Sequence, residues 1–308
     1  MKNDSLHQPV MVNEVIEALN IDRIAHLKEV RIVDATVGLG GHSIEFVKRG
    51  INVLGIDSDF NSLKIAENNL SKACPLSHIK HMGKCFTLIK GNFRNLKRIS
   101  LENNFNWVDG ILFDLGISSY QLNDLQRGFS FKYRESPLDL RIDKDSSAIN
   151  GMDLLNALNP SQLIDLFRIT LDYRRARDLS YAIVLARNKR KIEKVVDFLN
   201  IIDKTIFSKK SIDKATLPFL ALRIAVNSEL QNLRESLPQT LNILKSGGRC
   251  VVICFHSGED AIVKNIFKQM EIRKMVKIFI KKPILPGISE ININKRAKSA
   301  KLRYFEKI

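Results

Sequence analysis

The chain has 308 residues, of which 49 are Lys or Arg and 33 are Asp or Glu, so its formal net charge is +16. Its 44% apolar and 27% charged residues are typical of a folded globular protein, and its length predicts one large domain or two ordinary ones. No apolar run approaches the roughly 18 residues of a membrane helix, and the N-terminal residues lack the apolar core of a secretory signal. We therefore expect a cytoplasmic protein whose four cysteines are reduced thiols rather than a disulfide framework.

The positive charge is concentrated in two segments. Residues 264–308 hold 13 Lys and Arg against 3 Asp and Glu, and residues 168–194 hold 9 against 3. The two surpluses, ten and six, account for the whole net charge of +16. Two basic zones on a neutral body indicate a polyanionic partner, with nucleic acid as the first choice. The alternative is a solvated surface that only keeps the protein soluble.

Short apolar runs alternate with helical patterns in the first third of the chain, which predicts βαβ units and a parallel sheet. The expected strands are residues 31–35, 52–56, 86–89 and 108–113, and the expected helices are residues 43–49 and 60–70. Ser43 is a candidate N-cap for the first of these helices.

The pattern changes after residue 120. Residues 120–150 are polar and rich in turn formers, and residues 150–215 predict several helices without a strand. The remaining expected elements are helices over residues 217–230 and 259–270, and strands over residues 250–255, 276–280 and 302–305. This order predicts one α/β sheet domain, residues 1–120 and 216–308, interrupted by a helical domain, residues 121–215.

The segment Asp34–His42 (DATVGLGGH) follows the first expected strand and leads into a helix. Glycines in such a loop let the backbone approach a ligand, and the helix N-terminus offers free N–H groups. A dinucleotide site requires G-x-G-x-x-G, whereas this loop reads G-x-G-G-H-S, so a dehydrogenase is disfavoured. The acidic Asp34 before the loop instead fits a methionine-bearing nucleoside such as S-adenosylmethionine.

Polar side chains end the other expected parallel strands. Asp57 ends the second strand, 23 residues after Asp34, where a carboxylate accepts the ribose hydroxyls of a bound nucleoside. We assign Asp57 to the ribose and Asp59 to the N-cap of the next helix, although either could serve as the cap. Asn92–Phe93 follow the third strand and Asp114 ends the fourth. Ligands of open α/β sheets bind at these carboxyl ends, so we expect the four positions to share one site.

Two cysteine patterns are weaker evidence for a function. Cys74, His78, His81 and Cys85 form C-x3-H-x2-H-x3-C, which resembles a zinc ligand set, but the spacing is unusual and we predict no metal. Cys250 and Cys254 alternate in an apolar strand, where buried thiols are usually inert, so the thiolate mechanism of cytosine-C5 methylation is not expected.

Seven longer motifs, in their family order, identify a resemblance. The chain resembles the bacterial ribosomal RNA small subunit methyltransferase H family, the 16S rRNA cytosine-N4 methyltransferases of the MraW type, from His7 to the C-terminus. The motifs are Asp34–Ser43 (DATVGLGGHS), Phe113–Leu122 (FDLGISSYQL), Arg127–Phe131 (RGFSF), Pro137–Asp143 (PLDLRID), Ala221–Leu230 (ALRIAVNSEL), Gly247–Lys264 (GGRCVVICFHSGEDAIVK) and Lys298–Arg303 (KSAKLR).

The resemblance implies an S-adenosylmethionine-dependent transfer to N4 of a decoding-centre cytidine, position 1402 of 16S rRNA, within the small ribosomal subunit. It also implies an α/β class I methyltransferase fold, with a Rossmann-like sheet and a mostly helical inserted domain for substrate recognition. The cofactor-binding residues that it implies are Gly40, Gly41, His42, Asp57, Phe93, Asp114 and Gln121.

Four positions depart from the family pattern. Tyr120 replaces proline, Gly258 replaces leucine, and Leu220 replaces glutamine. Residues Tyr173–Arg177 (YRRAR) replace a Gly-Glu-Glu-Arg stretch, which removes two acidic residues from the insert. None of these changes touches the implied cofactor residues.

Methylation of a cytosine amine needs a group that accepts an amine hydrogen as the new bond forms. Asp114 and His256 are the candidates for this catalytic role, with Asp260 placed to orient His256. Asp114 could instead serve only the cofactor, and His256 could be a structural helix neighbour. The basic tail is expected to hold RNA phosphates through Lys295, Arg296, Lys298, Lys301 and Arg303, although part of it could be the last strand, burying Leu302 and Tyr304. The competing functions are methylation of another substrate and RNA binding without catalysis.

Overall fold

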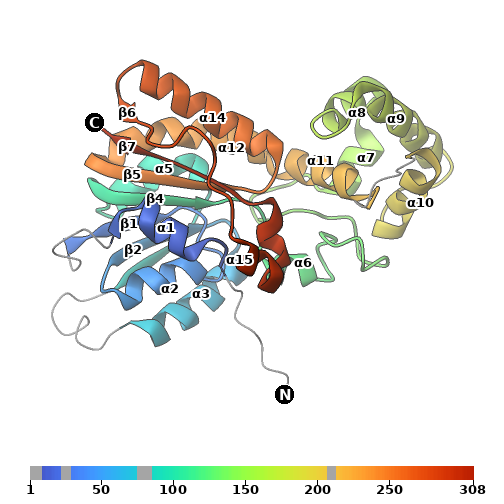
Figure 1. Cartoon of the computed structure of the whole chain (residues 1–308). Coiled ribbons are helices and arrows are strands. Elements are labelled where there is room, and N and C mark those ends of the chain that lie inside the picture. The colour runs from blue at the N-terminus through green and yellow to red at the C-terminus, as the bar shows by residue number, and fades with distance from the viewer. Residues whose placement is uncertain (1–8, 22–28, 75–84, 207–212) are drawn as a thin grey trace. The chain divides into compact units, whose positions relative to one another are not determined.

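Two compact units make up the chain (Figure 1). The computed structural model describes residues 9–21, 29–74, 85–206 and 213–308. Residues 1–118 and 230–308 form the first unit, and residues 119–229 form the second. We expected the helix over residues 217–230 to belong to the sheet domain. Instead, α11 (Thr216–Asn227) packs on helices of the second unit, so the boundary lies after Glu229 rather than after residue 215.

A seven-stranded sheet in the order β3-β2-β1-β4-β5-β7-β6 is the centre of the first unit. The first five strands in this order are parallel, and β7 runs antiparallel to both of its neighbours. This topology confirms the predicted Rossmann-like α/β fold. The strands are β1 (Arg31–Asp34), β2 (Asn52–Asp57), β3 (Phe86–Lys90), β4 (Val108–Asp114), β5 (Leu244–Cys254), β6 (Val276–Lys277) and β7 (Lys301–Lys307).

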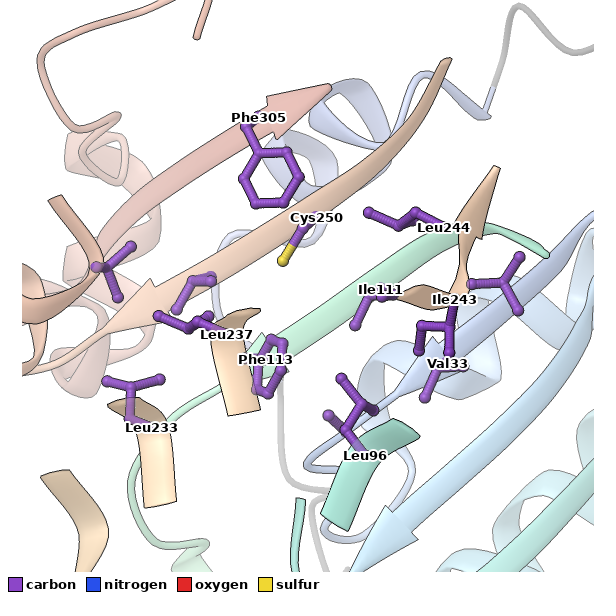
Figure 2. Packing of buried hydrophobic residues seen from close by; sticks show 14 of the residues in the cluster. Val33, Leu96, Ile111, Phe113, Leu233, Leu237, Ile243, Leu244, Cys250 and Phe305 are labelled. Carbon is purple, nitrogen blue, oxygen red and sulfur yellow. The ribbon is translucent and has the colours of Figure 1, made fainter. Parts of the chain in front are cut away.

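Alternating side chains of the strands fill two cores, one on each face of the sheet. Phe113 lies in one core and its neighbour Leu112 in the other. Figure 2 shows the first core, where Phe113 and Ile111 lie among side chains from the flanking helices. The helices that contribute to this core are α5 (Leu96–Glu102), α12 (Glu229–Ser236), α13 (Thr240–Ile243) and α14 (Ser257–Ile272). Those of the other core are α1 (Val12–Ala18), α2 (Gly41–Lys48) and α3 (Phe60–Ala73).

All seven expected strands are present, and two of them differ from the expected bounds by three or more residues at one end. Strand β5 begins at Leu244, six residues before the predicted start, because Val108 pairs with Leu244 while Gly110 pairs with Arg249. This shift in register is a bulge that accommodates Gly247 in a left-handed conformation, with φ at 78°. Strand β6 is shorter than predicted, with only Val276–Lys277 paired to β7.

In its described residues, 119–206 and 213–229, the second unit contains helices but no strand, together with an isolated bridge between Pro137 and Lys194. Its described helices are α6 (Ser119–Asn123), α7 (Gly151–Ala157), α8 (Pro160–Phe167), α9 (Tyr173–Arg187), α10 (Val195–Thr205) and α11. Phe198 lies between Phe167 and Phe219, with ring centroids 6.0 and 5.1 Å away, so three helices meet at an aromatic centre. Asn150 and Asn159 form capping boxes that fix the starts of α7 and α8.

The cysteines differ from our expectation. Cys74, just after α3, and Cys85, just before β3, form a disulfide with their Cα atoms 6.2 Å apart, so the prediction of reduced thiols is wrong for this pair. Cys250 and Cys254 are free and buried in β5, as expected. His78 and His81 of the possible zinc pattern lie outside the described residues. Elsewhere in the described chain, no group of three His, Cys, Asp or Glu side chains is arranged to hold a metal ion.

Each helix in the described part of the chain is too short or too polar to cross a membrane.

We expect Gly128→Ala to destabilise the protein by at least about 2 kcal/mol. Gly128 has φ at 68°, and an added Cβ would overlap the carbonyl oxygen of Pro137. Gly247→Ala is the matched control, because Gly247 also has a positive φ but no atom within 4 Å of its added Cβ. Urea unfolding followed by circular dichroism measures both changes. Equal losses in the two variants would contradict the role assigned to the Pro137 contact.

Candidate active site

Three carboxylates end neighbouring strands at one edge of the sheet. Asp34 ends β1, Asp57 ends β2 and Asp114 ends β4, and β1 pairs with both of the other two strands. Phe93 opens a short 3-10 helix, Phe93–Asn95, directly after β3. Its ring meets the ring of Phe113 edge-on, with centroids 5.8 Å apart. The structure therefore places the four predicted strand ends along one edge.

The glycine-rich loop turns sharply into α2 through Gly40, whose φ of 88° favours glycine. Helix α2 begins at Gly41, and its first N–H groups have no carbonyl partner within the helix. An added Cβ on Gly41 would lie 3.1 Å from Pro9, so this glycine also allows a close approach of the chain. The loop thus presents backbone donors at the edge of the sheet where the carboxylates lie.

Hydrogen bonds of Asp34 and Ser43 fix the conformation of this loop. The Ser43 hydroxyl donates to Asp34 Oδ2 at 2.7 Å, and the Thr36 N–H donates to Asp34 Oδ1 at 3.3 Å. The prediction that Ser43 caps α2 is therefore wrong, because Gly40 in its left-handed conformation is the cap. Asp34 is only 1% exposed, and burial raises the pKa of its carboxyl. Its oxygens are used within the loop, so Asp34 shapes the site rather than facing a ligand.

Asp57 ties the end of β2 to the same loop. Its Oδ2 accepts the Gly38 N–H and its Oδ1 accepts the Asp59 N–H, both at 2.8 Å. Burial raises the pKa of Asp57 to about 6 in spite of these two donors. Asp59 caps α3, as predicted, by accepting the Asn61 N–H at 3.2 Å. Asp57 is therefore held by backbone groups at the position where we expect the ribose.

His42 and Asp114 form a buried pair. His42 Nε2 lies 3.4 Å from Asp114 Oδ2, and the two side chains are 5% and 19% exposed. The Asp114 N–H donates to the Thr36 hydroxyl at 2.6 Å, which fixes the end of β4 against the loop. Burial lowers the pKa of His42, but the nearby Asp114, Asp34 and Glu290 outweigh it and raise the pKa above the ordinary value.

Asp114 Oδ1 is buried and has no hydrogen-bond partner among the described residues, and the buried His42 Nε2 has only its ion-pair contact with Asp114 Oδ2. Unsatisfied polar atoms of this kind are rare in folded proteins and costly unless a ligand completes them. The arrangement therefore fits a site for a polar ligand that contacts Asp114 and His42.

The C-terminal tail adds two charges that we did not assign to this site. Glu290, on α15 (Ile288–Ile293), accepts the Met11 N–H at 2.6 Å, and its charge raises the pKa of His42. Arg296 lies on the 3-10 helix Lys295–Ser299, where burial lowers its pKa and the charge of Asp114 raises it. We predicted Arg296 only as a phosphate contact of the tail. This electrostatic interaction joins residues far apart in the sequence, and no local motif signals it.

Two other tail cations are engaged within the protein. Arg303 Nε donates to Asp260 Oδ1 at 2.6 Å, and Lys301 Nζ lies 3.6 Å from Asp260 Oδ2. Both lie on β7, which buries Leu302 as the alternative reading of the tail predicted. Tyr304 is only partly buried. Asp260 therefore forms ion pairs with the tail and does not orient His256.

His256 caps α14. Its Nδ1 accepts the Glu259 N–H at 3.4 Å, and the Glu259 carboxylate accepts the N–H groups of Phe255 and His256, which completes a capping box. His256 Nε2 lies 3.2 Å from Glu259 Oε1. His256 thus has a structural role through Nδ1, while its Nε2 is buried and makes no hydrogen bond within the described residues. Gln121 lies on α6 of the second unit, where it is buried.

Comparison with known proteins decides the family of this chain. The MraW methylase family matches residues 4–308. The chain belongs to this family. The ribosomal RNA small subunit methyltransferase H of Dictyoglomus thermophilum is 42% identical over 307 residues, which cover 99% of this chain and 97% of the relative. The protein of the same name from Carboxydothermus hydrogenoformans is 37% identical, and the match covers 98% of each chain.

These matches confirm the resemblance drawn from the seven motifs. A solved structure of an rRNA methylase from Streptococcus thermophilus is 13% identical, with a TM-score of 0.42 over 91% of this chain and 88% of that one.

In this MraW-family chain, we expect Asp114→Asn to lower the pKa of His42. The variant keeps the shape of the side chain but removes the nearest negative charge, so burial of the imidazole is less opposed. In the wild type, the raised pKa means that His42 stabilises the fold fully below pH about 6.5, and that this contribution is lost as pH rises through the folded-state pKa.

An NMR titration of the histidine rings measures the shift, and His42→Gln assigns the resonance among the six histidines. The same midpoint for His42 in the wild type and in Asp114→Asn would show that the pair is not coupled.

Proposed function

We propose that this protein transfers a methyl group from S-adenosyl-L-methionine to N4 of a decoding-centre cytidine, position 1402 of 16S rRNA, in the small ribosomal subunit. Membership of the MraW methylase family and full-length relatives named ribosomal RNA small subunit methyltransferase H support rRNA methylation. The observation that carries the chemistry is Asp114, a strand-end carboxylate with one buried oxygen that lacks a partner. Such an oxygen is suited to accept a hydrogen from an amine.

The residues of the site fit the cofactor. Asp57 would accept the ribose hydroxyls, Phe93 would pack against the adenine, and the start of α2 at Gly40, Gly41 and His42 would bind the methionine part. The family resemblance also implies that Gln121 is a cofactor-binding residue. The cofactor, when bound, supplies an electrophilic methyl group at its sulfonium.

Asp114 is the first candidate for the catalytic group. The cytosine amine is a weak nucleophile because its lone pair is delocalised into the ring. Withdrawing an amine hydrogen toward Asp114 Oδ1 localises that lone pair as the new N–C bond forms. His42 Nε2 lies 3.4 Å from Asp114 Oδ2, which leaves Oδ1 as the oxygen that can face the amine. His256 remains the second candidate, although its ring is committed to the capping box of α14.

The cysteines argue against methylation of a ring carbon. That reaction requires a thiolate nucleophile. Cys250 and Cys254 are buried in β5, and burial raises the pKa of both thiols far above neutrality. Cys74 and Cys85 are joined to each other. The chain has four cysteines, so none provides the nucleophile, and the exocyclic amine is the preferred acceptor.

Contact with the RNA is expected to be electrostatic in part. Lys295 and Lys298, on either side of Arg296 in the sequence, are exposed. We propose that the protein acts in the cytoplasm, where it would meet the small ribosomal subunit. A target base in a structured RNA must be turned out of its stack to reach the site.

Incubation of the protein with labelled S-adenosylmethionine and small subunits that lack the modification is expected to label N4 of one decoding-centre cytidine. Nuclease digestion and mass spectrometry locate the label. Asp114→Asn should lower kcat by about 10²- to 10⁴-fold, while the affinity for S-adenosylhomocysteine changes only a few-fold. His256→Gln is the comparison and should retain most of kcat.

A label on another nucleotide would indicate a different RNA target, and the absence of S-adenosylhomocysteine would favour an RNA-binding protein without catalysis. Loss of cofactor affinity in Asp114→Asn without a separate effect on rate would restrict Asp114 to cofactor binding.

Affinity for S-adenosylhomocysteine is expected to fall about tenfold from pH 7.5 to pH 5, because a carboxyl with a pKa of about 6 is only about one-tenth ionised at pH 5. Asp57→Asn should lose about 10- to 100-fold in affinity at pH 7.5 and lose this pH dependence. Asp59→Asn, which keeps a capping side chain next to the site, is the control: it should keep the affinity at pH 7.5 and a pH dependence, with the midpoint moved down because the Asp59 charge helps to raise the pKa of Asp57. Isothermal titration calorimetry measures all three. A pH dependence that survives in Asp57→Asn would assign the titration to another group.

A further inference from the structure

Helix α9 of the second unit has one buried face and one face open to solvent. Ala176, Leu179, Ser180 and Ile183 are buried, and they follow the three- and four-residue spacing of a helix face. These side chains anchor α9 while α8 and α10 pack against it. The other face is therefore held in a fixed orientation on a packed helix.

The open face carries aromatic and aliphatic side chains among arginines. Tyr173, Tyr181 and Leu185 are 58%, 53% and 66% exposed. Tyr173, Arg177, Tyr181 and Leu185 are spaced four residues apart, so they form a continuous line along the helix. Together with Arg174, they are called the α9 stripe below. Single exposed apolar side chains are common, but a line of three among arginines indicates a binding surface.

The charge of the surrounding segment is not neutralised within the protein. Arg174, Lys189, Arg190 and Lys191 are exposed, and they form no ion pair with any residue in the described ranges. Arg177 pairs with Asp178 at 2.8 Å, but both side chains are more than 40% exposed, so water and salt weaken the pair. Arg187 has a different role, since it donates to the carbonyls of Leu155 and Leu158. Lys194 pairs with Glu135 outside the segment, so most but not all of the surplus of six positive charges in residues 168–194 remains available to a polyanion.

The composition of the stripe selects among nucleic acids. Arginines alone would bind any phosphate backbone, whether paired or unpaired. Exposed tyrosine rings bind the faces of bases, and a base offers its face only where it is unpaired. The guanidinium of Arg168 lies over the ring of Tyr173, 5.9 Å from its centroid, so a cation and an aromatic ring are already positioned together for stacking.

We propose that the α9 stripe binds an unpaired segment of ribosomal RNA, with Tyr173 and Tyr181 stacking on bases and Arg174 and Arg177 contacting phosphates. This inference rests on the proposed function and adds to it a recognition surface on the second unit. Arg174 and Arg177 belong to the stretch Tyr173–Arg177, where we noted a departure from the family pattern.

The test uses the full-length protein with two fluorescent probes, an unstructured 20-nucleotide RNA and a hairpin of the same composition. Tyr173→Ala/Tyr181→Ala is expected to weaken binding of the unstructured RNA by about 10- to 100-fold, because each stacked base is lost. Tyr173→Phe/Tyr181→Phe keeps the rings and should bind as the wild type. Arg174→Glu/Arg177→Glu should weaken binding and lower the slope of log Kd against log salt by more than about one.

The control for charge is Lys264→Glu/Lys268→Glu on the exposed side of α14 in the first unit, which changes the net charge by the same amount. It should have little effect on binding of the unstructured RNA. With small subunits as the substrate, the tyrosine variant should raise KM and leave kcat and the affinity for S-adenosylhomocysteine unchanged. Circular dichroism shows whether each variant is folded.

Three results would overturn the proposal. These are wild-type binding by the tyrosine-to-alanine variant, equal losses in the α9 and α14 charge variants, and binding of the hairpin as tight as that of the unstructured RNA. Failure of the proposed function is distinguishable, because the wild type would then bind the oligonucleotide through the stripe and yet transfer no methyl group to the subunit.

Discussion

Two buried carboxylates hold the glycine-rich loop, and the geometry of the candidate site depends on them. Asp34 binds the Ser43 hydroxyl from the end of β1, and Asp57 binds the Gly38 N–H from the end of β2. Each bond joins the loop or the start of α2 to a strand end that the sheet already fixes. The first N–H groups of α2 therefore point toward a defined position rather than a mobile one. Because both carboxylates are largely desolvated, the pKa of each is raised, and the loop is held at some cost in electrostatic energy.

The same loop connects to the catalytic candidate. Thr36, two residues after Asp34, accepts the Asp114 N–H, so the position of Asp114 depends on the loop conformation. His42 faces Asp114 from the first turn of α2, while Glu290 and Arg296 bring charges of opposite sign from the tail. The carboxylates of Asp114 and Glu290 raise the pKa of His42 in spite of its burial, so the tail influences the site electrostatically. The C-terminal segment is thus part of the site, in addition to any role in holding RNA.

The sequence predicts the fold well because the relevant signals are local. Apolar runs of four to seven residues predict the strands, and Asp59 is recognisable as the cap of α3. The carboxyl-end rule then places Asp57 and Asp114 together without any knowledge of side-chain contacts. The parts that were missed depend on residues far apart in the chain. Examples are the pairing of Arg303 with Asp260 and the packing of α11 within the second unit. Neither leaves a trace in the spacing or composition of its own segment.

The distribution of charge is a second case in which the sequence alone does not show the contacts, and this case concerns RNA binding. Counted along the chain, the tail has the larger surplus, ten against six, and it was the natural candidate for binding phosphates. Folding engages part of the tail, because Lys301 and Arg303 share Asp260 and Arg296 interacts electrostatically with Asp114. Around α9, Asp172 and Asp178 pair at exposed positions, where an ion pair screens little of the charge. The number of cations in a segment is therefore a poor guide to the charge that it offers at the surface, because the count does not show which cations are paired.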